Sequence, residues 1–183
     1  CAAAVGALRV RPVERKTAGL ILSEVPGQKP SLNEKGRKAI ALRLDALGIS
    51  LLAVETVPHE VGAMAAALRG LPGENALILT GSATSDLHDT GPEAVRQAGG
   101  RVDRFGIPVD PGNLLFLGDQ GGRPVIGLPG SARSPVLHGA DWVLERVACG
   151  LHLTGDDIAA MGVGGLLKEI PSRPQPRERD RGQ

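Results

Sequence analysis

Hydroxyl and acidic side chains gather in one short stretch that directly follows an apolar run. The segment Leu77–Val95 reads LILTGSATSDLHDTGPEAV; its apolar run stops at Thr80, and a helix-like pattern begins near Pro92. Backbone N–H groups at the start of a helix, with hydroxyls beside them, attract anions. A carboxylate facing such a site, here Asp89, usually holds a metal ion or a polar ring. The stretch therefore predicts a site for a phosphorylated ligand with a polar head group, with or without magnesium.

Two further loops have a similar character, and each follows a predicted strand. Val109–Asn113 reads VDPGN, and Gly127–Pro135 reads GLPGSARSP. Glycine at positions 81 and 130 allows the backbone to come close to a ligand, because no Cβ atom stands in the way. These loops are therefore the other candidate walls of the site.

A second interpretation of the same residues stays open. Asp89 or Thr90, and likewise Ser131, can simply cap the helices that follow them, as residues in such loops commonly do. His59 and Glu60 are interpreted as surface residues in the first turn of another helix, where the helix dipole favours an acid. A catalytic role for that pair is the alternative.

Strand-like and helix-like patterns alternate along the chain and would position these loops. Strands are predicted at residues 18–23, 49–57, 75–81 and 101–109, followed by two strands joined by a Gly121-Gly122 turn. Helices are predicted at residues 31–47, capped by Ser31 and ended by Gly48, and at 59–71, 91–99 and 135–149, with a short turn at 154–162. This alternation indicates an α/β domain with a largely parallel sheet, which binds ligands at the carboxyl ends of its strands.

Length and composition narrow the class of protein. The chain has 183 residues, a net charge of +1 and only 2% aromatic residues. We expect a lead-in arm at 1–16, one domain at 17–165 with an aliphatic core, and a linker or disordered tail at 166–183. The weak net charge argues against a nucleic-acid partner, and the absence of a long apolar run argues against a membrane span. Two cysteines without zinc spacing favour a cytoplasmic setting.

Taken in order, the three loops resemble those of the molybdopterin-binding domain family, which includes molybdopterin molybdenumtransferases, molybdopterin adenylyltransferases and gephyrin-type domains. LILTGSATSDLHDTGPEA is similar to the family's strand, glycine-rich loop and acidic helix start. VDPGN is similar to its Lys-Pro-Gly-Lys loop, and VIGLPGSARSP to its Gly-Leu-Pro-Gly-Asn-Pro loop. The resemblance covers about residues 17–155. It implies a three-layer α/β/α sandwich with a mostly parallel central sheet.

The resemblance also implies roles for individual residues. Asp89 matches the family's functional acid, which implies a catalytic and metal-binding role in magnesium or molybdate chemistry. Ser23 and Glu24 match the polar end of the family's first strand. The residues implied to hold molybdopterin are Gly81, Ser82, Thr84, Ser85, Asp86, Pro111, Gly112, Pro129, Gly130 and Ser131.

Several positions depart from the family pattern. Asp110 and Asn113 stand where the family has two lysines, and Ser82 replaces the second glycine of its loop. His59 followed by Glu60 replaces an aspartate, and the asparagine expected at the start of the first helix has no counterpart near Lys35 or Gly36. Losing two cations removes Coulomb attraction for an anion. This weakens the case for adenylyl transfer and molybdate insertion more than the case for pterin binding.

Two functional hypotheses follow. In the first, the chain binds molybdopterin during molybdenum cofactor biosynthesis and, if active, is a magnesium-dependent transferase. In the second, it is a catalytically degenerate scaffold or oligomerisation module. A narrower resemblance, to versions fused to a nucleotidyltransferase-like domain, implies such a domain in a longer chain, and homo-oligomerisation is also expected. The retained Asp89 and Gly-Leu-Pro-Gly loop favour the first hypothesis, and the missing lysines favour the second.

Overall fold

The computed structural model describes residues 10–162 and 164–165. The strands are β1 (Thr17–Glu24), β2 (Ser50–Pro58), β3 (Asn75–Leu79), β4 (Arg101–Phe105), β5 (Val109–Asp110), β6 (Phe116–Gln120), β7 (Arg123–Leu128) and β8 (Gly164–Gly165). The helices are α1 (Pro30–Ala46), α2 (Val61–Gly70), α3 (Thr90–Gln97), the 3₁₀-helix η2 (Gly130–Arg133), α4 (Gly139–Ala148) and α5 (Gly155–Ala159).

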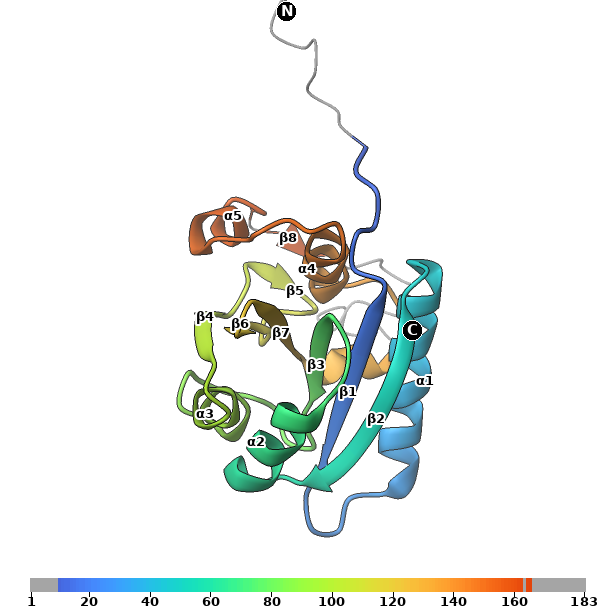
Figure 1. Ribbon diagram of the computed structural model, residues 1–183, viewed down its shortest axis with the longest axis vertical. Helices are drawn as coiled ribbons and strands as arrows, with labels where there is room; N and C mark the ends of the chain where they lie inside the picture. The colour runs from blue at the N-terminus through green and yellow to red at the C-terminus, as the bar shows by residue number, and fades with distance from the viewer. Residues whose placement is uncertain (1–9, 163, 166–183) are drawn as a thin grey trace, which may run out of the picture.

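In the described part of the chain, the main sheet has six strands in the order β2-β1-β3-β7-β6-β4. The first four are parallel, whereas β6 and β4 run antiparallel to their neighbours. The short strands β5 and β8 form a separate parallel pair (Figure 1). The mostly parallel sheet is therefore confirmed, and β3 lies in its middle with the Gly81–Pro92 loop at its carboxyl end.

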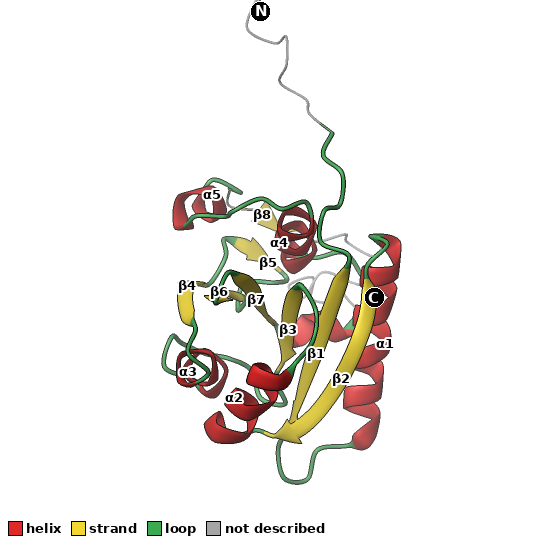
Figure 2. Cartoon of the chain, viewed as in Figure 1, coloured by secondary structure: helices red, strands yellow, loops and turns green. Residues whose placement is uncertain are grey.

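Helices cover both faces of the sheet, which confirms the three-layer α/β/α sandwich (Figure 2). On one face, aliphatic residues of α1 and α4 pack against β1, β3 and β7. On the other face, residues of α2 and α3 pack against the same strands and against Phe116. All five residues of β3 are buried, as an apolar strand covered on both sides should be.

The ends of α1 agree only in part with the sequence analysis. Gly48 follows the helix with a φ of 65°, as predicted for a residue that ends a helix. Ser31 is not the cap: the helix begins at Pro30, and the residue before it, Lys29, makes no side-chain capping bond. Proline suits this first position because its missing N–H would have no partner there.

Two predicted elements were wrong in extent. The strand predicted at 101–109 ends at Phe105, because Gly106 takes a φ of 79° and turns the chain away toward β5. The last long helix begins at Gly139 rather than Pro135. Ser134, which precedes that proline, is extended with a ψ of 141°, because proline disfavours a helical conformation in the residue before it.

Residues 10–16 form an arm without regular secondary structure. The backbone N–H groups of Glu14 and Arg15 both donate to the carbonyl of Ala148, at 2.9 and 3.0 Å, and so attach the arm to the end of α4. The predicted tail at 166–183 lies outside the described residues. No helix within the described part is both long and apolar enough to cross a membrane.

The packing of Phe116 on Gly127 gives a test of this fold. The two residues are cross-strand partners in β6 and β7, and a Cβ atom on Gly127 would overlap the Phe116 ring. We expect Gly127→Ala to destabilise the protein by about 1–3 kcal/mol, measured by urea unfolding. Gly62→Ala is the control, because open space surrounds Gly62 in α2 and alanine is the better helix former by ~1 kcal/mol. Equal stability of the two variants would contradict this packing.

Candidate functional site

The loops after β3 and β7 lie side by side because these strands pair in parallel, with Leu79 opposite Leu128. The guanidinium of Arg133, in η2, joins them: its Nη2 donates to the carbonyl of Thr80 at 2.7 Å. Two of the three predicted walls of the site are thus brought together at the carboxyl edge of the sheet.

The first part of the β3–α3 loop is held by hydroxyl groups. The Thr80 hydroxyl donates to the carbonyl of Ser82 at 2.5 Å and lies 3.4 Å from the Thr84 hydroxyl. Thr84 is buried, whereas Ser82, Ser85 and Asp86 are exposed. The threonines therefore shape the loop, and the exposed residues remain accessible to a ligand.

Asp89 closes the same loop and caps α3. One carboxylate oxygen accepts from the N–H of Thr90 at 2.7 Å, and the other accepts from the N–H and hydroxyl of Ser85 at 2.9 and 3.2 Å. Partial burial disfavours the ionised carboxylate, but these hydrogen bonds outweigh it, and the nearby His59 adds to them, so the pKa of Asp89 is lowered. The capping interpretation of Asp89 is confirmed.

Gly81 is joined to His59 through Ser23. The N–H of Gly81 donates to the Ser23 hydroxyl at 2.9 Å, and that oxygen lies 2.8 Å from Nδ1 of His59. Ser23 is fully buried and His59 is half-buried. The helix α2 begins at Val61, so the place predicted for His59 in its first turn is wrong. A Cβ atom on Gly81 would lie 2.6 Å from Oε1 of Gln28. This glycine is therefore required by packing within the protein.

Asn33 is a residue that the sequence analysis missed. It lies in the first turn of α1, so the stated lack of an asparagine at the start of that helix was wrong. Its side chain is buried, donates to Oε1 of Glu24 at 3.1 Å and accepts from Nε2 of Gln28 at 3.0 Å. The usable signal was its position just after Pro30, because a proline often marks the start of a helix.

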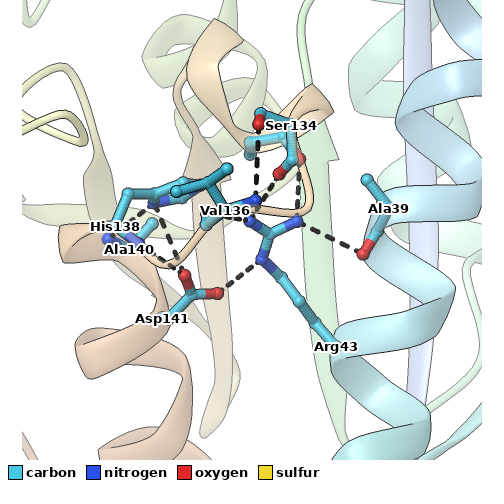
Figure 3. Close-up of polar contacts among 8 residues, drawn as sticks. Ala39, Arg43, Ser134, Val136, His138, Ala140 and Asp141 are labelled. Carbon is cyan, nitrogen blue, oxygen red and sulfur yellow. Dashed lines mark hydrogen bonds and ion pairs between the residues drawn. The ribbon is translucent and has the colours of Figure 1, made fainter. Parts of the chain in front are cut away.

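The segment after β7 is held in place by Arg43 from α1 (Figure 3). The Arg43 guanidinium donates to the carbonyls of Ala132, Ser134 and Val136, at 2.9, 2.7 and 3.1 Å. It also pairs with Asp141 at 2.5 Å. These contacts fix the path of the chain from η2 into α4.

The cap of α4 is His138, not Ser131. The buried His138 accepts the N–H of Ala140 at Nδ1, at 3.1 Å, and Asp141 accepts the backbone N–H of His138 in return, at 2.8 Å. Burial, followed by the charge of Arg43, lowers the pKa of His138 against the opposing effect of Asp141. Ser131 makes no capping bond in η2, which leaves its hydroxyl available to a ligand.

The glycine and proline of the β7 loop differ in exposure. Pro129 is buried, whereas Gly130 is exposed, and the atom nearest to a Cβ built on it is Nη1 of Arg133 at 3.5 Å. Larger side chains thus have room at Gly130. This makes it the glycine at the site whose small size is not explained by packing within the protein.

The third predicted wall, VDPGN, packs against the start of α4. The carbonyl of Pro111 accepts from the N–H of Gly139 at 2.8 Å, and a Cβ atom on Gly112 would lie 2.9 Å from that same nitrogen. Gly112 is buried with a φ of 128°. No hydrogen bond found in the described chain links this segment to the Gly81–Asp89 loop. Asp110 and Asn113 are exposed on it.

The electrostatics of the site depend on Arg133, a second residue that the sequence analysis missed. Burial lowers the pKa of its guanidinium, yet an arginine stays charged at neutral pH. Its Nε is buried without a hydrogen-bond partner. Arg133 therefore places a positive charge between the β3 and β7 loops.

The acidic side chains near the loops are dispersed or already hydrogen-bonded. Among residues 10–162 and 164–165, no three His, Cys, Asp or Glu side chains gather closely enough to hold a metal ion. Both carboxylate oxygens of Asp89 already accept hydrogen bonds from Ser85 or Thr90. Asp89 thus serves to close its own loop in this structure.

The closed loop gives a prediction for Asp89→Asn. An asparagine keeps one oxygen acceptor but turns an N–H group toward the N–H donors, so we expect a loss of roughly 1 kcal/mol at neutral pH. Because folding lowers the pKa of Asp89 from its ordinary 3.8, its contribution is complete above that value and is lost as the pH falls through the folded-state pKa. The two proteins should therefore converge in stability in acid. Urea unfolding across pH measures this, with the exposed Asp156→Asn as control.

Comparisons with known proteins identify the family of the chain. A family model described as a probable molybdopterin binding domain matches residues 24–147, a range that contains all three loops. Among solved structures, the molybdopterin biosynthesis MoeA protein from Pyrococcus horikosii is similar, with 23% identity and a TM-score of 0.49. That match covers 63% of this chain and 30% of the other. No curated protein matches the chain. Since the family match spans well over half of the 183 residues, the chain belongs to the probable molybdopterin binding domain family.

Proposed function

We propose that the chain binds a phosphorylated pterin of the molybdopterin type at the carboxyl edge of the sheet, between the β3 and β7 loops. The hydrogen bond from Arg133 to the Thr80 carbonyl carries the proposal, because it places a cation between two loops rich in small and hydroxyl residues. Family membership supplies the class of ligand.

The phosphate end of the ligand suits these two loops. The exposed Ser82 and Ser85 offer hydroxyl donors, and Ser131 offers a third from the opposite loop. Gly130 leaves space for an approaching group, since no side chain fills it. The charge of Arg133 attracts an anion and strengthens each hydrogen bond to it.

The proposal is one of binding and does not include metal-dependent transfer. Among the described residues, no three His, Cys, Asp or Glu side chains gather as metal ligands, so molybdate insertion and adenylyl transfer are not part of the proposal. Asp89 contributes by closing its loop through Ser85 and Thr90. Its part in ligand binding is therefore to position the hydroxyls beside it.

Gly130→Leu tests the proposal directly. The variant should fold normally, because a Cβ atom at this position meets only the end of the Arg133 side chain. The added side chain would occupy the space assigned to the phosphate, so we expect molybdopterin to bind about 10- to 200-fold more weakly. Isothermal titration calorimetry on the wild type and the variant, with matched thermal melts, measures both effects. Undiminished affinity in a folded variant would move the site elsewhere.

A second function, as an oligomerisation module, is supported by a different surface. Leu42, Val136 and Leu137 are 63%, 59% and 52% exposed. Leu42 and Leu137 border a hollow of about 330 Å³ between α1 and α4. Exposed apolar groups beside a hollow are typical of interaction sites. The comparisons identify no nucleotidyltransferase domain within the 183 residues, so a second copy of the chain is the partner to test.

Sedimentation of the wild type and of a Leu42→Gln, Leu137→Gln double variant tests this second function. Association of the wild type that is lost in the variant would support an oligomerisation module. Leu42 lies on the surface of α1, and Leu137 lies just before α4. Both are away from Arg133, so the affinity for molybdopterin should be unchanged. A wild type that stays monomeric at high concentration would exclude self-association through this surface.

A further inference from the structure

A separate hollow lies beside the glycine loop, between the turn that follows β1 and the end of β2. It has a volume of about 470 Å³ and is lined by residues 24–28 and 56–60. Gln28, on its wall, also packs against Gly81, with its Oε1 2.6 Å from where a Cβ atom would be. The hollow is thus next to the loop assigned to the phosphate, and it is available to another part of the same ligand.

One wall of the hollow carries an oriented hydrogen-bond donor. The Ser23 hydroxyl accepts the N–H of Gly81 at 2.9 Å, and the same oxygen lies 2.8 Å from Nδ1 of His59, to which its proton can be donated. A neutral imidazole that accepts at Nδ1 carries its proton at Nε2. Nε2 of His59 makes no hydrogen bond with the described residues, so it can donate to a ligand.

The hollow also carries an oriented acceptor beside His59, whose backbone N–H donates to the Glu24 carbonyl at 2.8 Å. The buried Asn33 donates to Oε1 of Glu24 at 3.1 Å and is itself held by Gln28 at 3.0 Å. This chain of bonds orients the exposed Glu24 carboxylate and leaves Oε2 without a partner among the hydrogen bonds of the described chain. Preorganised acceptors of this kind bind N–H groups strongly because little freedom is lost.

The charge of the hollow distinguishes it from the phosphate loops. Glu24 and Glu60 both line it, Asp89 is close enough to interact electrostatically with His59, and no lysine or arginine is among the lining residues. The carboxylates of Glu24 and Glu60 repel an anion and attract N–H donors. A phosphate is therefore better placed beside Arg133 than in this hollow.

We infer that the hollow binds the N–H-bearing edge of the ligand's ring, with Glu24 as acceptor and His59 as donor. The 2-amino-4-oxo edge of a pterin presents two adjacent N–H donors followed by a carbonyl oxygen. A carboxylate accepts the two donors in a bidentate pair, and Nε2–H of His59 donates to the carbonyl. The inference rests on the proposed function for the ligand class and adds the residues that select its ring.

The test uses two rings without phosphate, so that its outcome is separate from that of the phosphate site. Pterin carries the 2-amino group, and lumazine carries an oxygen in its place. We expect the wild type to bind pterin at least about tenfold more tightly than lumazine, measured by fluorescence titration. Glu24→Gln should abolish this preference. Glu55→Gln, on the neighbouring edge strand β2 and outside the hollow, should retain it.

The remaining variants separate the two sites. His59→Gln should weaken the binding of pterin and lumazine alike. Gly130→Leu should leave the affinity for both rings unchanged but weaken the binding of molybdopterin. Glu24→Gln should also lower the affinity for molybdopterin, by about the same factor as it lowers the affinity for pterin. Equal affinity of the wild type for the two rings, an unaltered preference in Glu24→Gln, or no detectable binding of pterin would each overturn the inference. Ring selectivity without molybdopterin binding would instead refute the proposed function alone.

Discussion

The candidate site depends on the interaction of one buried guanidinium, that of Arg43, with the chain that leads from η2 to α4. This connection has no regular secondary structure between Ser134 and His138, so its carbonyl groups have no partners from a sheet or helix. Arg43 donates to two of them, those of Ser134 and Val136. It also donates to Ala132 in η2, to Ala39 in its own helix and to Asp141, and its side chain is only 10% exposed. Breaking such a pair by removing one charged partner costs about 3–5 kcal/mol, because the other charge stays buried.

The position of Arg133 follows from this constraint. With α1 and α4 joined through Arg43 and Asp141, η2 lies against α1, and a Cβ atom on Gly36 would come within 2.6 Å of Leu79 and 3.5 Å of Arg133. In this position the Arg133 side chain reaches the Thr80 carbonyl. Two arginines thus have distinct parts: Arg43 satisfies the backbone of the connection, and Arg133 brings charge to the edge of the sheet.

The polar residues at this edge serve folding and binding together. Ser23 accepts from Gly81 and contacts His59, so one buried hydroxyl joins the carboxyl ends of β1, β2 and β3. Asp89 caps α3 and closes its loop with the same carboxylate. Groups that are already hydrogen-bonded lose little freedom when a ligand arrives, which is the benefit of a preorganised site. The capping and ligand-binding interpretations of these loops are therefore compatible.

Local patterns determined the elements and their layers. The apolar run of β3 must be buried on both faces, so the sequence predicted a sheet between two layers of helices. Parallel strands align their carboxyl ends, so the sequence also predicted the edge that carries the loops. Gly48 and the Gly121-Gly122 turn were also predictable, because a positive φ is a local requirement that glycine meets.

Tertiary structure decided which side chains meet. Ser23 and His59 are 36 residues apart, Ser23 and Gly81 are 58 apart, and Arg43 and Asp141 are 98 apart. No periodicity within one element specifies such pairs, since each depends on how two or three elements pack. For the same reason, the sequence analysis put His59 in a helix, began the last helix too early and overlooked Arg133. Hydrophobic periodicity is a local property of each segment. The partner of a buried polar group, in contrast, is determined only when the segments pack together.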